Sequence, residues 1–244
     1  YAPYSPHSPF TAPQRYLDQF ASVRDEKRQT CLAMMACVDD SVGSIVAALK
    51  EHKVLDNTII WYISDNGAPS NGGGLNQPLN GWKGQLLDGG VRVPFIVSWP
   101  SKLAAGHQYS EMVSTLDLLP TCLAVAGREK QPTDLDGVNL LPFLTGIQDG
   151  APHDALFFRW MGRAALRTDQ WKLLLHRGEV SLFNLKNDPS ESKDLSEQEP
   201  AICDQLKARL QSWLTALPKV KSPPDANPRR RPRKQHDDSE TAPL

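Results

Sequence analysis

The sequence predicts an α/β fold that ends in a small antiparallel sheet and a final helix. Three observations carry this prediction: helical periodicity over residues 15–52, a nearly unbroken apolar run over residues 58–63, and short strand-like runs after about residue 155. The chain has 244 residues, of which 40% are hydrophobic, enough for one large domain with a small appendage. We therefore expect an α/β domain over residues 1–150, a small α+β part over residues 151–217 and a disordered tail over residues 218–244.

The first predicted element is a helix over residues 15–52 with a break near residue 24. Apolar side chains recur along it at steps of three and four residues, which places them on one helical face. This face comprises Leu32, Met35, Val38, Val42, Ile45, Val46 and Leu49. Asp39 and Asp40 lie on or beside the polar side, so the pattern predicts an amphipathic helix.

Two strands are predicted in the first part of the chain. Residues 58–63, TIIWYI, resemble a central strand that is covered on both faces. Residues 93–99 form a second apolar strand, which Pro100 ends. A short helix is expected over residues 115–126, and turn signals predict a loop over residues 130–150.

The last ordered part is predicted to be an antiparallel meander followed by a helix. Polar or glycine-containing breaks separate several of the four strand-like runs, which are ALFFRW, AALRT, WKLLLH and VSLFNL. The final helix is expected over residues 197–217, with Ser196 as its N-cap. Its apolar stripe comprises Ile202, Leu206, Leu210, Trp213 and Leu217.

Composition excludes several classes of partner. The net charge of −1 argues against nucleic-acid binding through bulk charge, and we interpret the basic cluster at residues 229–234 as a solvated charge run. No apolar run reaches the ~18 residues that are needed to span a bilayer.

The four cysteines form no CxxC pair, so we expect free thiols rather than a zinc site, with Cys31 and Cys37 buried.

The block over residues 64–94 carries the clearest chemical signal. Asp65 and Asn66 stand just past the end of the first predicted strand, which is where open α/β sheets place their ligands. A carboxylate oxygen and an amide oxygen suit a hard divalent cation. An Asn-Gly pair is also a common turn dipeptide, so a plain turn is the alternative at this point.

Two further side chains are candidates for contact with an anion. Lys83 lies between glycines in GWKG and can approach a sulfate or phosphate as a point charge; a solvated loop lysine is the alternative. His7, in PHSP, can contact an anion or protonate a leaving oxygen near neutral pH; a surface histidine is the alternative. For residues 88–92 we expect a structural role.

Together these segments resemble the sulfatase family over about residues 2–215. Residues 6–20 resemble the family's segment around its active-site histidine, and residues 38–67 are similar to the helix and strand that deliver its metal-binding Asp-Asn pair. Residues 76–100, NQPLNGWKGQLLDGGVRVPFIVSWP, resemble its lysine block, a highly specific motif. The segments LRTDQWKLL and LFNLKNDPSESKDL are similar to its C-terminal subdomain.

The resemblance implies an alkaline-phosphatase-like α/β sandwich that hydrolyses sulfuric esters, with sulfated carbohydrates among its substrates. It implies Ca²⁺ or another divalent cation, bound partly by Asp65 and Asn66. It further implies that Lys83 holds sulfate oxygens and that His7 contacts the sulfate or the leaving oxygen. The family's nucleophile is formylglycine, made from Cys or Ser in a C/S-x-P/A-x-R motif, and its members imply a periplasmic or secreted location.

The sequence departs from the family pattern at several points. None of its cysteine segments carries the modification motif, so we expect formylglycine and the remaining metal ligands upstream of residue 1, and we expect the chain alone to be inactive. Asn80 stands where many members have arginine, and Asp88 where most have glutamate. Two other functions stay open: a related phosphodiester or phosphonate hydrolase, and a non-catalytic remnant that binds sulfated glycans.

Overall fold

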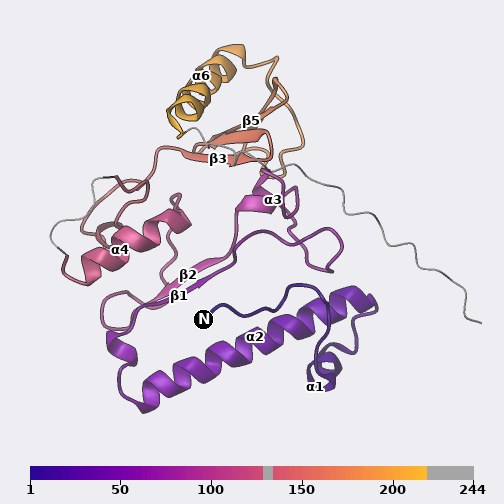
Figure 1. Cartoon of the computed structure of the whole chain (residues 1–244), viewed down its shortest axis with the longest axis vertical. Coiled ribbons are helices and arrows are strands. Elements are labelled where there is room, and N and C mark those ends of the chain that lie inside the picture. The colour runs from indigo at the N-terminus through magenta and orange to yellow at the C-terminus, as the bar shows by residue number, and fades with distance from the viewer. Residues whose placement is uncertain (129–133, 219–244) are drawn as a thin grey trace, which may run out of the picture.

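The computed structural model describes residues 1–128 and 134–218 (Figure 1). The predicted tail, from residue 219 onward, lies outside the described residues, as does part of the predicted loop over residues 130–150. The described helices and strands are α1 (Gln14–Leu17), α2 (Glu26–Glu51), β1 (Ile60–Ile63), α3 (Asp88–Val91), β2 (Phe95–Ser98), α4 (Leu118–Val125), α5 (Leu141–Leu144), β3 (Leu156–Trp160), β4 (Arg163–Arg167), β5 (Trp171–His176), β6 (Glu179–Asn184) and α6 (Pro200–Ala216).

The break predicted near residue 24 is confirmed. Helix α1 ends at Leu17, a short 3-10 turn follows, and α2 begins at Glu26. Asp25 is the N-cap of α2, and its carboxylate accepts a hydrogen bond from the backbone N–H of Arg28 at 2.6 Å. This bond satisfies one of the N–H groups that a helix start leaves without a partner.

The apolar face of α2 differs from the predicted one. Met34 is buried, whereas Met35 and Ile45 of the predicted stripe are 37% and 39% exposed. Helix α1 packs against α2, where the hydroxyl of Tyr16 donates to the carboxylate of Asp40 at 2.7 Å. This contact covers a side of α2 that periodicity alone does not single out.

Among the described helices, α2 is long and apolar enough to cross a membrane by length and composition alone. The helix contains no unbroken apolar run of that length, because Asp39 and Asp40 interrupt the sequence near its middle. Core helices of globular proteins pass the same test, so one such helix is weak evidence for a membrane span.

Strands β1 and β2 form an antiparallel pair, in which Ile60 faces Ser98 and Ile63 faces Phe95. The apolar run predicted a strand covered on both faces, but all four residues of β1 are half-buried. In the described chain β1 pairs with β2 alone, and α2 and α4 lie on opposite sides of the pair (Figure 1). An apolar run indicates that a strand is buried, but it does not determine how many strands surround it.

Strands β3 to β6 form a meander in which each strand pairs antiparallel with the next, as predicted. Side chains alternate between the two faces of the sheet. One face packs against α6 in a core of Ala155, Ala164, Leu166, Leu173, Leu182, Cys203, Leu206 and Leu210. The other face carries Arg167 and Lys172, which pair in register across β4 and β5, and it lies toward α3 (Figure 1).

Helix α6 begins at Pro200 rather than at residue 197, so the predicted N-cap is wrong. Glu199 is the residue at the cap, and Ser196 instead donates its backbone N–H to the carboxylate of Asp194 at 2.9 Å. Proline has a fixed φ that suits the first helical turn, and it needs no N–H partner there. The predicted apolar stripe is confirmed at its centre, where Leu210 is fully buried.

Replacing Leu210 with alanine is expected to lower the free energy of unfolding by about 2–5 kcal/mol, because truncation leaves a cavity between α6 and the sheet. Chemical unfolding followed by tryptophan fluorescence measures this change. Gln211→Ala, one residue along the helix on its exposed side, is the matched control and should change stability by less than about 0.5 kcal/mol. Equal stability of the two variants would contradict the proposed position of the core.

The cysteines are free thiols, and Cys31 and Cys37 are half-buried rather than fully buried as expected. Burial raises the pKa of both thiols and of Cys203, which keeps these groups protonated near neutral pH. Protonated thiols are poor nucleophiles, so the described structure gives none of the three a reactive setting.

Candidate active site

Asp65 and Asn66 lie immediately after β1, in a bend held from both sides. The backbone N–H of Ser64 donates to the carbonyl of Pro94 at 3.2 Å, and the hydroxyl of Ser64 donates to the carbonyl of Asn66 at 2.9 Å. Asp65 is exposed and Asn66 is half-buried. Among the described residues neither side chain makes a hydrogen bond or an ion pair, so their oxygens are available to a ligand.

Gly67 shows why a glycine follows this pair. Its backbone N–H donates to the carbonyl of Gly90 at 3.1 Å, and a Cβ at this position would collide with the carbonyl of Gly89. The glycine therefore permits close contact between two backbone segments, and its φ is not in the left-handed region. The turn interpretation of the Asn-Gly pair does not account for this contact.

Asn76 joins the segment after the Asp-Asn pair to the lysine block. Its amide nitrogen donates to the carbonyls of Ala68 at 3.1 Å and Gly81 at 2.9 Å, and its amide oxygen accepts from the N–H of Ala68 at 2.8 Å. The backbone N–H of Lys83 also donates to the carbonyl of Ala68, at 3.1 Å. These bonds hold Lys83 close to the segment that carries Asn66.

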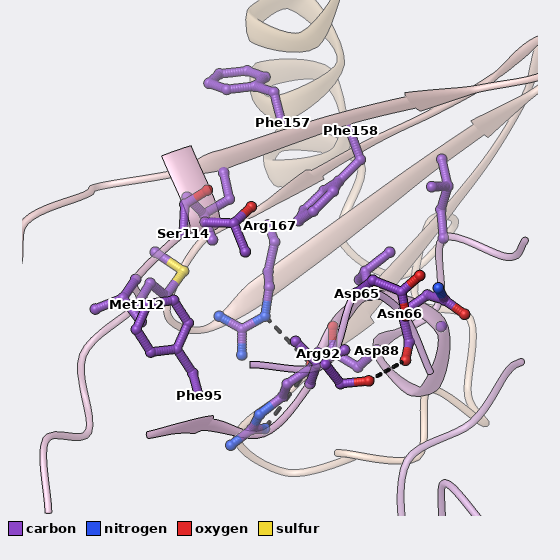
Figure 2. A pocket seen from close by; sticks show the side chains of 18 of the residues that line it. Asp65, Asn66, Asp88, Arg92, Phe95, Met112, Ser114, Phe157, Phe158 and Arg167 are labelled. Carbon is purple, nitrogen blue, oxygen red and sulfur yellow. Dashed lines mark hydrogen bonds and ion pairs between the residues drawn. The ribbon is translucent and has the colours of Figure 1, made fainter. Parts of the chain in front are cut away.

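Asp65, Asn66 and Lys83 line one cavity of about 1010 Å³. Figure 2 shows Asp65 and Asn66 on the side of the cavity near Asp88, with the apolar side chains of other elements around it. These include Phe95, Met112, Phe157 and Phe158. The cavity thus combines two oxygen donors and one lysine cation with apolar walls, a combination typical of small-molecule sites.

His7 does not line this cavity. It is exposed, its Nδ1 lies 3.0 Å from the carbonyl oxygen of Ser8, and its ring makes an edge contact with Tyr4. The same segment reaches the glycine-rich loop, because Phe10 packs next to Gly72. A role for His7 in the reaction therefore stays a prediction.

Asp65 and Asn66 fit a hard divalent cation in the kind of donor that they offer, but not in number. Ca²⁺ takes roughly 6–8 oxygen ligands, and carboxylate and amide oxygens are both suitable. Within residues 1–128 and 134–218, no group of three or more His, Cys, Asp and Glu side chains is arranged to hold a metal. The pair can thus supply part of a coordination shell.

A buried charged cluster, not predicted from the sequence, joins the C-terminal sheet to α3. Lys172 is fully buried, and its Nζ lies 2.7 Å from Oδ1 of Asp88 and 3.1 Å from Oε1 of Glu191. Oδ2 of Asp88 also accepts from Nε of Arg167 at 3.3 Å (Figure 2). Burial alone would raise the pKa of Asp88, but Lys172 and Arg167 together lower it below its usual value.

Glu191 completes this cluster from an unusual backbone conformation. Its φ is 51°, in the left-handed region that a non-glycine residue rarely adopts, and its Oε2 accepts from the backbone N–H of Asp88 at 2.6 Å. Its Oε1 is close to Lys172 but makes no aligned hydrogen bond. Burial raises the pKa of Glu191, and Lys172 offsets this only in part.

The cluster supports the site through the residues that follow Asp88. Gly89 donates its N–H to the carbonyl of Asn80 at 2.7 Å, and Gly90 accepts from Gly67. In the sequence, this cluster is indicated only by Lys172 in the strand-like run WKLLLH and by Glu191 in the NDPSE segment. The alternation of side chains along the strand would place Lys172 on a face exposed to solvent. That face is buried because α3 covers it, and a contact so distant along the chain cannot be predicted from the local pattern.

Two family models match the chain. Residues 1–128 match the family described as Sulfatase, and residues 81–218 match the one described as N-sulphoglucosamine sulphohydrolase, C-terminal. The two matches overlap in the lysine block, so both include Lys83.

Curated relatives point the same way. Arylsulfatase J of Mus musculus is 30% identical over 280 residues, which cover 93% of this chain and 46% of the relative. N-acetylgalactosamine-6-sulfatase of Sus scrofa is 41% identical over 111 residues, which cover 43% of this chain and 21% of the relative. The chain spans less than half the length of either relative.

Solved structures show the same fold. The crystal structure of Ps i-CgsB in complex with k-i-k-neocarrahexaose has a TM-score of 0.78 and 35% identity, covering 86% of this chain and 48% of that chain. The putative sulfatase yidJ from Bacteroides fragilis has a TM-score of 0.72 at 23% identity, and the match covers 86% of this chain and 52% of that one. The predicted alkaline-phosphatase-like fold is therefore confirmed, and, with a family model matching residues 1–128 of its 244, the chain belongs to the sulfatase family.

Proposed function

We propose that the protein containing this chain hydrolyses sulfuric esters and that sulfated carbohydrates are its substrate class. The observation that carries this proposal is the convergence of Asp65, Asn66 and Lys83 on one cavity. Their side chains come from two separate loops, and Asn76 fixes those loops to each other. Such an arrangement can hold the negatively charged sulfate group of an ester between a metal ion and the ammonium group of a lysine.

The chemistry assigned to this chain is binding and charge stabilisation. Lys83 would contact a sulfate oxygen through its ammonium group, and this interaction strengthens as negative charge develops on the transferring group. Asp65 and Asn66 would hold a divalent cation, which supplies Lewis-acid stabilisation of the same group when bound. His7 is proposed to contact the sulfate or the leaving oxygen. We assign no nucleophile within the chain.

Two observations support the carbohydrate part of the proposal. Ps i-CgsB, at 35% identity, was solved in complex with k-i-k-neocarrahexaose, an oligosaccharide. The cavity of about 1010 Å³ is also large enough for more than the ester group itself, because typical small-molecule pockets measure about 300–1,000 Å³.

Replacing Asp65 with alanine is expected to abolish specific Ca²⁺ binding by the full-length protein, because it removes the one carboxylate of the proposed pair. Isothermal titration calorimetry with CaCl₂ measures the affinity. Asp149→Ala, at an exposed position away from the cavity, is the matched control and should bind Ca²⁺ like the wild type. Unchanged affinity in the Asp65 variant would remove this residue from the metal site.

The function itself is tested by sulfate release from 4-nitrocatechol sulfate and from sulfated oligosaccharides by the full-length protein. Turnover of both supports the proposal. Faster hydrolysis of a phosphodiester or a phosphonate would favour the related hydrolases of the same superfamily. Binding of sulfated oligosaccharides without turnover of any ester would instead indicate a non-catalytic glycan-binding protein.

A further inference from the structure

The tip of the β3–β4 hairpin presents a tryptophan beside the proposed sulfate site. Trp160 ends β3 and pairs in register with Arg163, which begins β4. The two residues between them, Met161 and Gly162, have φ values of 45° and 76°. Positive φ at both positions is typical of the tight type I′ hairpin turn, which matches the twist of the strands.

The indole of Trp160 adjoins the residue after Lys83. A Cβ placed on Gly84 would have the indole Nε1 at 3.9 Å, and, apart from the chain neighbours Lys83 and Gln85, this is the described atom that comes within 4 Å of that position. Trp160, Lys83 and Gly84 all line the same cavity. The indole and the lysine block therefore meet at Gly84, on the wall of the cavity that Lys83 also lines.

A second aromatic ring shares this side of the sheet. Phe158 is two residues before Trp160, so the two side chains lie on the same face of β3. Figure 2 shows the ring of Phe158 extending from β3 into the cavity. Phe157, which alternates with them, turns to the other face and stacks on Trp213 at 5.2 Å between ring centroids. Phe157 and Trp213 also line the edge of the cavity, but their rings pack against each other, whereas Phe158 and Trp160 lie on the opposite face of the strand.

The exposure of Trp160 is what requires an explanation. The residue is 49% exposed, although tryptophan is highly buried on average. A sugar ring has an apolar face of C–H groups and a polar rim of hydroxyls. An indole offers a flat apolar surface with one N–H donor at its edge, which complements both features. Such a surface costs little entropy to use when its backbone is already fixed.

We propose that Trp160, with Phe158 beside it, forms the subsite against which the sugar of the sulfate ester stacks while Lys83 holds the sulfate group. This inference rests on the proposed function and extends it from the ester to the group that carries the ester. In this arrangement the two loops with Asp65 and Lys83 recognise the sulfate, and the β3–β4 hairpin recognises the carbohydrate.

The test uses the full-length protein and a panel of sulfated oligosaccharides from carrageenan, chondroitin sulfate and heparin. Trp160→Ala is expected to lower kcat/KM for the best-cleaved oligosaccharide by about 10-fold, the loss of one stacking contact, mainly through KM. The Ki of inorganic sulfate as a competitive inhibitor should stay at its wild-type value, because the proposed contacts with sulfate come from Lys83, the metal pair and His7 and do not include Trp160. Trp160→Phe should recover most of the lost efficiency. Met161→Ala, on the same hairpin tip and 81% exposed, is the matched control and should behave as the wild type.

Several results would overturn the inference. Unchanged kinetics in Trp160→Ala would show that the sugar does not use this side chain. Equal weakening of oligosaccharide turnover and of sulfate inhibition would indicate that the tryptophan only supports the fold. If the wild-type protein hydrolyses 4-nitrocatechol sulfate but none of the oligosaccharides, the proposed carbohydrate subsite is refuted, whereas hydrolysis of sulfate esters is still supported. Failure to release sulfate from any ester would instead refute the proposed function itself.

Discussion

Replacing Lys83 with alanine is expected to lower the turnover of sulfate esters by about 100-fold or more, because the reaction loses one preorganised positive charge at the transferring group. The structure makes this variant informative. The side chain of Lys83 is exposed to the cavity and makes no ion pair within the described part of the chain. Only its backbone N–H is used structurally, in the bond to Ala68. Alanine keeps that bond, so the thermal stability of the variant should equal that of the wild type.

Steady-state kinetics with 4-nitrocatechol sulfate measures the expected loss, with inorganic sulfate inhibition as a second readout. Lys83→Arg keeps a positive charge and should retain part of the activity. Lys102→Ala, at an exposed position outside the cavity, controls for the general loss of a surface lysine. Near-wild-type turnover in Lys83→Ala would refute the proposed contact with sulfate, and the metal pair alone would then have to stabilise the developing charge.

Sequence patterns predicted most of the fold because local signals were strong where tertiary context was simple. The β3–β6 meander follows from short apolar runs between polar breaks, and each predicted run contains or overlaps an observed strand. The predictions failed where neighbours along the chain do not decide the outcome. The exposure of Met35, for example, depends on which part of the chain covers α2. The start of α6 is a different case, because Pro200 is a local signal for the first helical turn that the prediction of Ser196 as N-cap passed over.

In the candidate site, too, some residues could be predicted from the sequence and others could not. Asp65, Asn66 and Lys83 were identified from short motifs and from the family that they resemble, and the structure places all three on one cavity. Asn76, which joins their loops, begins the lysine block, but the motif did not indicate what its side chain does. Its role depends on backbone groups of Ala68 and Gly81 that only the fold brings together. Residues that position a site are therefore harder to find from sequence than residues that would contact the ligand.

Lys172 is the clearest case of such a positioning residue. Replacing it with methionine is expected to lower the free energy of unfolding by about 3–5 kcal/mol, because the carboxylates of Asp88 and Glu191 are left buried without their cation. Methionine has a similar length, so little packing volume is lost. Chemical unfolding at pH 7 measures the change. Lys186→Met is the matched control: its ion pair with Asp169, at 2.7 Å, is exposed and should contribute only about 0–1 kcal/mol.

The dependence of this loss on pH separates charge from packing. The lowered pKa of Asp88 means that its contribution to stability is present above the unfolded value of 3.8 and is lost as pH falls through the folded pKa. The raised pKa of Glu191 has the opposite sign, since its ionised form is disfavoured in the folded state above 4.5. Without Lys172 both carboxyls should take up protons more readily, which relieves the uncompensated charge. The stability deficit of Lys172→Met should therefore be largest near pH 7 and should shrink toward pH 4. A deficit that stays constant over this range would show that Lys172 contributes through packing, and that the cluster does not hold α3 and the lysine block in place by charge.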